Sequence, residues 1–234
     1  MSTNNFSGEW KRLTADGAIE SRRPPYHEIM PQRKREAAAA AKLFGTTPIH
    51  LDHPQRHYMR DDGVFAEVRY GCERPNVVPP DVPTIITAYE HEPSVQRLAE
   101  IILDKDPEAV ITHGVTAGDI EHFATCLLTT RAYRKAAKAG YDGRLLQWQE
   151  LNIEIHGPLN YRWNTFVDVS TQWEEKLAAI GMHACQIPDP FRLEPRNWGP
   201  ACGCRHAEVF NLIAGDSPPG PDAAFTIEIL SNMR

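Results

Sequence analysis

The sequence predicts an α/β fold with a mostly parallel sheet and helices on both faces. Helical and strand-like patterns alternate through residues 33–125, and such alternation is typical of parallel strands connected by helices. Within this region the run Ala-Val-Ile-Thr-His-Gly at 109–114 is short and apolar, as expected of a strand buried on both faces of such a sheet. The 234 residues are enough for one large domain or two small ones.

The N-terminal segment, residues 1–31, is polar and irregular, and within it 10–18 predict a short strand that runs into a turn. The rest of this segment is predicted to be a loop that ends at Pro31. A helix is expected over 32–45, because its alanine-rich sequence favours a helix intrinsically and Gly45 can end it.

A strand, two loops and a second helix are predicted next. Residues 48–52 predict a short strand, 53–65 a loop with an Asp-Asp-Gly turn, and 71–84 a proline-rich loop. A helix is expected over 94–106, with Ser94 as its N-cap. Its apolar side chains recur at helical spacing and form one stripe: Val95, Leu98, Ala99, Ile102 and Leu103.

The C-terminal half continues the alternation of helices and strands. After the strand at 109–114, a helix is predicted over 121–140, ending at Gly140. Further strands are predicted over 145–155 and 164–170, helices over 171–181 and 204–214, and a last strand over 223–230. Thr171 and Glu174 have the spacing of a capping box.

The composition excludes some classes of partner. The formal net charge is −6, which argues against a nucleic-acid partner because phosphate-binding surfaces need an excess of basic residues. No apolar run approaches the roughly 20 residues that span a bilayer, and the N-terminus lacks the apolar core of a signal peptide. We therefore expect a cytoplasmic protein without a membrane partner.

The five cysteines are odd in number, and their spacing suggests no disulfide framework, so a reducing compartment is expected. Cys202, Cys204 and His206 could form a corner for a soft metal, which makes a metal-binding protein one alternative. Two cysteines separated by one residue, without a second pair elsewhere, make a poor structural zinc site. The preferred interpretation is a tight glycine turn of small residues.

Candidate functional residues gather where the strand at 109–114 meets the next helix, which is the edge where α/β sheets bind ligands. His122 begins this helix, where the positive end of the helix dipole favours a neutral imidazole, the form that binds a metal. Asp119 or Glu121 could accept the other ring N–H. One histidine and two acids do not make a catalytic zinc site, which needs three protein ligands, so a local hydrogen-bonding role is the alternative.

Four stretches, in this order, resemble motifs of the LmbE-like (PIG-L) zinc-dependent N-deacetylases. They are the alanine-rich helix from Arg33, Arg-Asp-Asp-Gly-Val at 60–64, residues 112–125, and residues 167–186 followed by His-Ala-Glu-Val-Phe at 206–210. The first is similar to the family's Arg-x-x-Glu helix. The last contains His-Ala-Cys-Gln where the family has His-x-Ser-Gln, and its His-Ala-Glu-Val-Phe is similar to an Ala-Glu-x-Phe helix. The resemblance spans residues 10–213 and implies a Rossmann-like fold.

The resemblance implies a hydrolase that removes an acetyl group from a small N-acetylated sugar conjugate, such as N-acetylglucosamine attached to an inositol. His122 would be a zinc ligand, and Asp119 would stabilise the oxyanion or protonate the leaving amine. Arg33 and Asp61 would hold the sugar hydroxyls, and His183 would match a late histidine near the site. Zinc in this family polarises the carbonyl and activates water, while an aspartate acts as the base.

One motif of the family is absent from the sequence. Ala-His-Pro-Asp-Asp-Glu supplies two zinc ligands and the base, but the sole His-Pro here, at 53–54, is followed by Gln-Arg. The N-terminal strand and helix of the fold are therefore expected to be missing before residue 10. The expected organisation is an irregular segment over 1–31, an LmbE-like domain over 32–214, and a linker with a C-terminal extension over 215–234.

Two explanations of the missing motif stay open: a shortened form of an active deacetylase, or a relative that lost its site. Loss of a central strand would expose backbone and apolar surface, so we expect poor solubility or association into a homo-oligomer. If other residues rebuild the site, His53, His57 and Asp61 are the nearest candidates. The alternative function is a catalytically inactive relative that binds a sugar conjugate without turnover.

Overall fold

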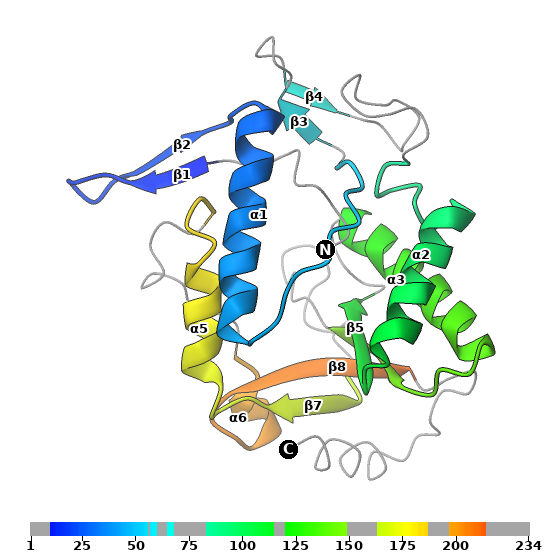
Figure 1. Ribbon diagram of the computed structural model, residues 1–234. Helices are drawn as coiled ribbons and strands as arrows, with labels where there is room; N and C mark the ends of the chain where they lie inside the picture. The colour runs from blue at the N-terminus through cyan, green and yellow to red at the C-terminus, as the bar shows by residue number, and fades with distance from the viewer. Residues whose placement is uncertain are drawn as a thin grey trace. The chain divides into compact units, whose positions relative to one another are not determined.

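The computed structural model describes residues 10–55, 57–59, 65–67, 83–114, 120–148, 163–186 and 197–213. The chain divides into two compact units, whose elements are labelled in Figure 1. The first unit comprises residues 1–86 and 171–195, and the second comprises 87–170 and 196–234. The domain limits expected at residues 31 and 214 stay predictions.

The first unit begins with an antiparallel hairpin of β1 (Trp10–Leu13) and β2 (Ile19–Arg22). The strand predicted within 10–18 is confirmed by β1, but β2 was not predicted. All four residues of β2 are exposed, so no alternation of buried and exposed side chains marks this strand in the sequence. Gly17 turns the chain with a φ of +81°, which glycine adopts without strain.

Helix α1 (Tyr26–Leu43) begins earlier than the predicted residue 32. The prediction of a loop up to Pro31 is therefore wrong. A proline inside a helix removes one backbone hydrogen bond, but Ile29 in the same stretch is fully buried. Burial of an isoleucine contributes roughly 1.5–3 kcal/mol, which offsets the lost bond. The predicted end is confirmed, since Gly45 follows the helix with a φ of +64°.

Helix α5 (Trp173–Gly181) packs against α1 within the first unit, as Figure 1 shows. This helix was predicted over 171–181, but the predicted capping box does not form. Gln172 is the N-cap residue, and Thr171 Oγ1 donates a hydrogen bond to Gln172 Oε1 at 2.7 Å instead of bonding a backbone N–H of the helix.

The segment between α1 and the second unit differs from the prediction in two places. Residues 48–52 form no strand, because Asp52 has a φ of +59°, and this left-handed conformation interrupts an extended backbone. The segment predicted as a loop contains a second antiparallel hairpin, β3 (His57–Met59) with β4 (Phe65–Glu67).

The second unit is built on a four-stranded sheet in the order β5-β6-β8-β7. Its strands are β5 (Ala109–His113), β6 (Arg144–Trp148), β7 (Thr165–Asp168) and β8 (Ala207–Ile213). β5 and β6 pair in parallel, whereas β8 lies antiparallel between β6 and β7. Three strands therefore run in one direction and β8 runs in the other. The predicted α/β class is confirmed, and the sheet is mixed.

Strand β8 corrects the helix that was predicted over 204–214. Its buried side chains are Ala207, Val209, Phe210 and Leu212, a short apolar run that periodicity alone does not assign to a helix or a strand. The hydrogen bonds to β6 and β7 select the strand, and these pairings are not visible in the local sequence.

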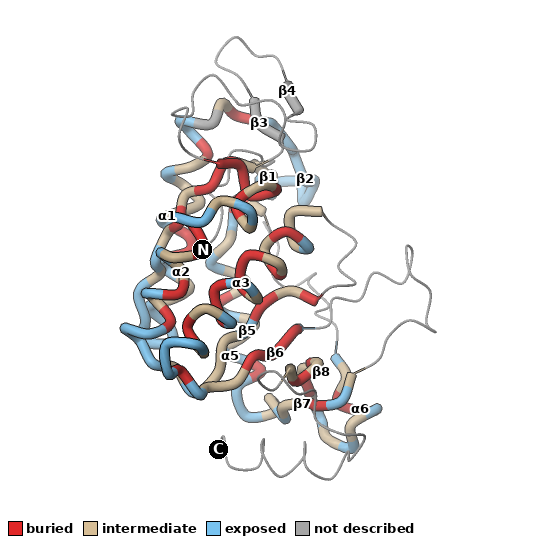
Figure 2. The backbone as a smooth tube through the Cα atoms, turned by 90° about the vertical axis from the view of Figure 1, so that its right-hand side faces the viewer, coloured by how far each residue is buried: buried red, intermediate tan, exposed pale blue. Residues whose placement is uncertain are grey.

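Two helices form a layer on this sheet. Helix α3 (Ile120–Lys138) packs on β5 and β6, and α2 (Glu92–Lys105) packs on α3. Figure 2 shows buried positions along α3. Gln147 Nε2 donates to Cys126 Sγ at 3.5 Å, so α3 covers the sheet face that bears Gln147. Leu146 points to the opposite face, where it packs with Phe210 and Leu212.

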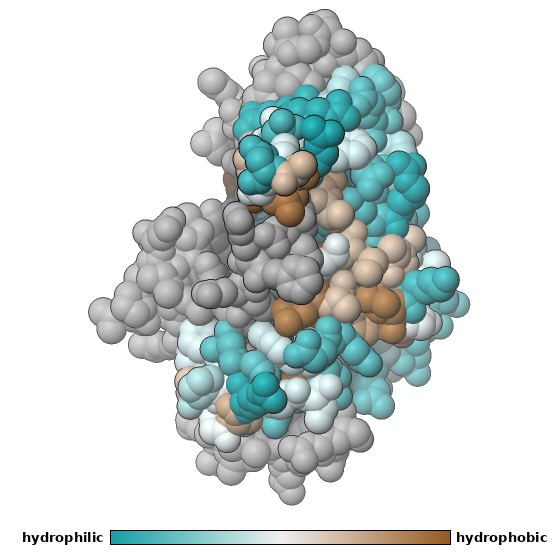
Figure 3. Space-filling model, turned by 90° about the vertical axis from the view of Figure 1, so that its left-hand side faces the viewer, coloured by the Kyte–Doolittle hydropathy of each residue, from teal (hydrophilic) through white to brown (hydrophobic). Residues whose placement is uncertain are grey.

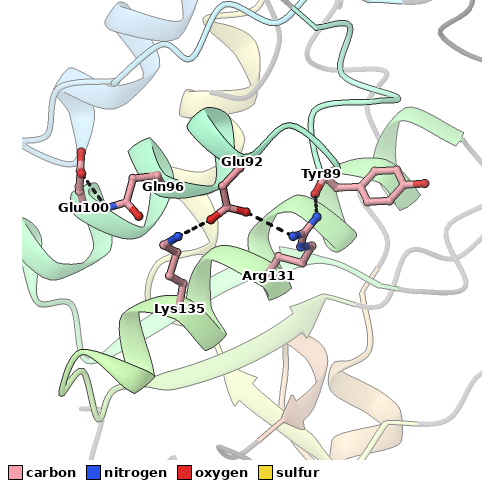
Figure 4. A network of polar contacts seen from close by, with 6 residues as sticks. All are labelled: Tyr89, Glu92, Gln96, Glu100, Arg131 and Lys135. Carbon is pink, nitrogen blue, oxygen red and sulfur yellow. Dashed lines mark hydrogen bonds and ion pairs between the residues drawn. The ribbon is translucent and has the colours of Figure 1, made fainter.

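An exposed ionic network connects α2 and α3 (Figure 4). Glu92 Oε2 lies 3.4 Å from Arg131 Nη2, and Glu92 also pairs with Lys135. Arg131 donates to the carbonyl of Tyr89. Exposed ion pairs contribute about 0–1 kcal/mol each, so the buried side chains between these helices stabilise the layer more than the network does.

Helix α2 confirms the helix predicted over 94–106 but not its cap. His91 is the N-cap residue, and its Nδ1 lies 2.8 Å from Ser94 Oγ. The cap was predicted after Pro93, but this proline lies in the first turn of the helix, where its missing N–H would have no partner.

Strand β5 is an edge strand among the described strands, and the prediction that it is buried on both faces is wrong. Ile111 is 58% exposed, whereas the neighbouring Thr112 is buried. An apolar residue in a strand sequence does not reveal whether a neighbouring element covers it.

The described surface carries several large apolar side chains. None of the described helices is long and apolar enough to cross a bilayer. On the face drawn in Figure 3, hydrophobic residues gather in separate patches between hydrophilic residues. Apolar atoms normally form a large part of a protein surface, so such patches need no special explanation.

The burial of the cysteines predicts their reactivity. Cys126 and Cys185 are buried, whereas Cys202 and Cys204 are partly exposed. We expect an alkylating reagent at mildly alkaline pH to label the second pair in the native protein and the first pair only after denaturation. Peptide mass spectrometry would measure this order. Native labelling of Cys185 ahead of Cys204 would contradict the described packing.

Candidate functional site

The turn after β5 brings His122, which the sequence singled out, together with a second histidine. His113 ends β5 and His122 lies in the first turn of α3. Their rings stack with centroids 4.1 Å apart and planes inclined by 6°. Both side chains are half-buried. Asp119, which was predicted to act beside them, lies outside the described residues.

Trp148 extends this aromatic group from the neighbouring strand. It pairs with His113 in the register of β5 and β6, and the two ring centroids are 6.4 Å apart. Trp148 Nε1 donates to Glu208 Oε2 at 2.8 Å, which fixes the indole on the sheet. The ring of His122 is therefore held by His113, and His113 has Trp148 beside it.

The donor set at this turn does not by itself fit a catalytic zinc ion. Such an ion needs three protein ligands and an open position, and the part of the chain that the structure describes contains no group of three or more His, Cys, Asp or Glu side chains placed to hold a metal. The stacked rings of His113 and His122 supply at most two ligands, fewer than a catalytic zinc ion needs.

A second group of predicted residues meets in the first unit. Glu36 on α1 accepts hydrogen bonds from the backbone N–H and the thiol of Cys185, both at 2.9 Å. Arg33, one turn earlier on α1, has its Nη1 4.0 Å from Cys185 Sγ. His183 lies in the turn after α5, two residues before Cys185. The structure thus brings together Arg33 and His183, which belong to segments far apart in the sequence.

The electrostatics of this group favour a neutral imidazole. Burial lowers the pKa of His183 below its ordinary value of 6.5, the nearby Arg33 lowers it further, and Glu36 acts in the opposite direction. At neutral pH His183 is therefore mainly uncharged and can accept a proton. Arg33 supplies N–H donors that can bind hydroxyl or carbonyl oxygens. Together they can bind a polar substrate and move a proton.

The lowered pKa of His183 predicts an acid-dependent loss of stability. The unfolded chain binds a proton near pH 6.5, whereas the folded chain resists it, so stability is complete above this pH and falls as the pH drops below it. We expect His183→Gln to flatten the decline of the unfolding free energy below pH 6.5, measured by urea titration. An unchanged decline would show that other groups dominate it.

The raised pKa of the Cys185 thiol predicts that the protein loses stability at alkaline pH. Burial raises its pKa to about 12, and the hydrogen bond to Glu36 and the charge of Glu36 act in the same direction. The unfolded thiol loses its proton near pH 9.0, whereas the folded one keeps it, so stability is lost as the pH rises above this value. Cys185→Ser should make this loss less steep in urea titrations. Equal slopes would contradict the assignment.

The other proposed sites are not assembled in the described residues. His53, considered as a substitute ligand, is buried, and its Nδ1 lies 3.2 Å from the carbonyl oxygen of Pro83. Asp61 and the side chain of His57 lie outside the described residues.

At Cys202 and Cys204 the predicted glycine turn is confirmed, since helix α6 (Gly199–Cys202) ends at Gly203 with a φ of +72°. The sequence did not predict the contact between Glu36 and Cys185, which only the structure shows.

Solved structures of known proteins show the fold that this chain shares. It aligns with N,N'-diacetylchitobiose deacetylase from Pyrococcus horikoshii at a TM-score of 0.53 and 18% identity, over 94% of this chain and 75% of that one. It aligns with the 4-carboxy-2-hydroxymuconate hydratase GalB from Pseudomonas putida KT2440 at a TM-score of 0.52 and 17% identity, over 83% and 76% of the two chains.

A conserved protein from Thermus thermophilus aligns at a TM-score of 0.50 and 19% identity, over 80% of this chain and 74% of that one. No protein-family model matches the sequence, and no curated protein matches it. At these identities the likeness shows the fold alone, which is an α/β fold.

Proposed function

We propose that this chain is a hydrolase that removes an acetyl group from an N-acetylglucosaminyl-type conjugate. The junction of Arg33, Glu36, His183 and Cys185 carries the proposal, because it joins two of the four stretches that resemble the N-deacetylases. The fold shared with a diacetylchitobiose deacetylase supports it. The fold is also shared with a hydratase, and both reactions add water to a substrate.

The described residues suggest how such a substrate would be used. Arg33 would donate hydrogen bonds to sugar hydroxyls from its partly exposed position on α1. His183, kept neutral by burial and by Arg33, would accept a proton or return one to the leaving amine. Asp61 and Asp119 keep the roles in hydroxyl binding and oxyanion stabilisation that the resemblance implies.

We also propose that His122 is one ligand of a zinc ion, whose chemistry would be to polarise the amide carbonyl. Its first-turn position on α3 favours a neutral ring, and the stack on His113 fixes the plane of that ring. The described residues do not complete the zinc site, so further ligands would have to come from other parts of the chain.

Acetate release tests the proposal. The purified chain would be incubated with N-acetylglucosaminyl-inositol and N,N'-diacetylchitobiose, with added zinc and with a chelator, and acetate would be measured enzymatically. We expect release with zinc and its loss with the chelator. Saturable binding of a conjugate without acetate, measured by calorimetry, would instead support an inactive relative that binds sugars. If the chain neither binds a conjugate nor releases acetate, both functions are rejected.

A further inference from the structure

Glu36 is a carboxylate in the interior of the first unit, where it accepts three hydrogen bonds. It is 4% exposed. Its Oε1 accepts from the backbone N–H of Cys185 and from Gln32 Nε2, each at 2.9 Å. Its Oε2 accepts from the thiol of Cys185, also at 2.9 Å. Two of the three donors therefore belong to one residue in a turn that is remote in the sequence.

We propose that Glu36 is a positioning residue, which sets the place of His183 relative to Arg33 by holding both hydrogen-bond donors of Cys185. This inference rests on the proposed function, in which Arg33 and His183 act on the same substrate. Glu36 itself touches neither the substrate nor the reacting atoms in this assignment.

The turn that contains both His183 and Cys185 connects the contact with Glu36 directly to the position of His183. Arg33 and Glu36 are three residues apart on α1, so they lie on the same side of the helix. His183 and Cys185 belong to one tight turn, in which the N–H of Gln186 donates to the carbonyl of His183 at 2.8 Å. A displacement of Cys185 along α1 would therefore carry His183 with it.

The other side of Cys185 is held by the N-terminal hairpin. The backbone N–H of Lys11 in β1 donates to the carbonyl of Cys185 at 2.7 Å. The N–H, the carbonyl and the thiol of Cys185 are thus all bonded to other segments of the first unit. The carboxylate of Glu36 provides two of these three attachments.

A carboxylate at this place is better explained by geometry than by stability. Burial of a charged group is unfavourable unless every oxygen finds a donor, and an apolar side chain would hold α1 and the turn together without fixing their orientation. Two oxygens that accept from two donors of one residue define both the position and the orientation of the turn. Catalytic groups need placement within about 0.5 Å.

A series of four variants tests the proposal. Cys185→Ala removes the thiol donor, and Cys185→Ser restores a donor in the same place. Glu36→Gln keeps an oxygen for the backbone N–H but turns an amide N–H₂ toward the thiol. Glu100→Gln is the matched control, because Glu100 accepts a bond from Gln96 on α2 at 2.7 Å, as Glu36 does from Gln32, but is exposed (Figure 4).

Two measurements are made on each folded variant: the NMR titration of the His183 ring, and kcat and KM for acetate release. We expect Cys185→Ala and Glu36→Gln to change the His183 titration and to lower kcat about 10- to 100-fold, because a displaced catalytic group reacts slowly, with KM within about twofold. Cys185→Ser and Glu100→Gln should resemble the parent in both measurements.

The outcomes separate this inference from the proposed function. Folded Cys185→Ala and Glu36→Gln with the parental His183 titration and kcat would overturn the positioning role. Loss of kcat in Cys185→Ser equal to that in Cys185→Ala would overturn it as well, because the donor would then not matter. A parent without acetate release would reject the proposed function. The His183 titration in Cys185→Ala, which keeps the charge of Glu36 that acts on His183, would still decide whether the contact with Glu36 positions this ring.

Discussion

Replacement of His122 by alanine is expected to remove bound zinc and acetate release together. The loss of a partner that only orients a metal ligand lowers metal affinity about 10–100-fold, and the loss of a ligand should lower it further. His122→Ala should therefore hold less than about a hundredth of the zinc of the parent under limiting free metal. Mass spectrometry of metal content after gel filtration measures this, and acetate release should fall in parallel.

Two controls make the result specific to His122. His113→Ala removes the ring that stacks on His122 at 4.1 Å but not the proposed donor, so zinc affinity should fall only about 10-fold. His27→Ala changes an exposed histidine on α1 and should leave the zinc content unchanged. Equal zinc in the parent and in His122→Ala would reject this ligand. If neither the parent nor His122→Ala holds zinc, the result would favour an inactive relative that binds sugars without turnover.

A large loss of stability is expected from Gly143→Ala. A Cβ atom at this position would overlap the hydroxyl of Tyr141 and lie 2.5 Å from the carbonyl oxygen of Pro107. These two groups are bonded to each other at 2.7 Å, and the carbonyl of Gly143 accepts from Tyr133 at 2.8 Å. The new methyl group therefore has no space unless the start of β6 moves.

We expect Gly143→Ala to lower the free energy of unfolding by about 3 kcal/mol, since overpacking costs about 1–3 kcal/mol and the displaced Tyr141 bond about 1 kcal/mol more. Urea titration followed by circular dichroism measures this change. The exposed neighbour Asp142→Ala should alter stability by less than about 0.5 kcal/mol.

A double variant tests the cause of this loss. Tyr141→Phe removes the hydroxyl that the new Cβ atom would overlap, and also the bond to Pro107 that Gly143→Ala would displace. The costs of the two changes should therefore not add fully when they are combined. Full additivity of the two changes would contradict the proposed clash.

The local sequence determined the elements whose signals are local. Helices at 32–45, 94–106, 121–140 and 171–181 were predicted from propensity, spacing and glycine ends, and α1, α2, α3 and α5 confirm them. Strands β5, β6 and β7 were also placed correctly. Propensity and periodicity act over a few residues, so a sequence contains them in full.

The tertiary structure decided the elements that depend on remote partners. Strand β8 is a strand because β6 and β7 bond to it on either side. Ile111 is exposed on the sheet face opposite the one that α3 covers, whereas Thr112 is buried on the α3 face. The helical start before Pro31 depends on the buried Ile29. No pattern within 204–214, 109–114 or 26–31 reports these contacts.

The candidate site shows the same division. The sequence singled out Arg33, His122 and His183 by residue type and motif order. Only the structure showed that His122 stacks on His113 and that the Glu36 carboxylate binds Cys185 from another segment. Residue types are fixed by the sequence, but distances between side chains arise from packing between remote elements, which decides the geometry on which chemistry depends.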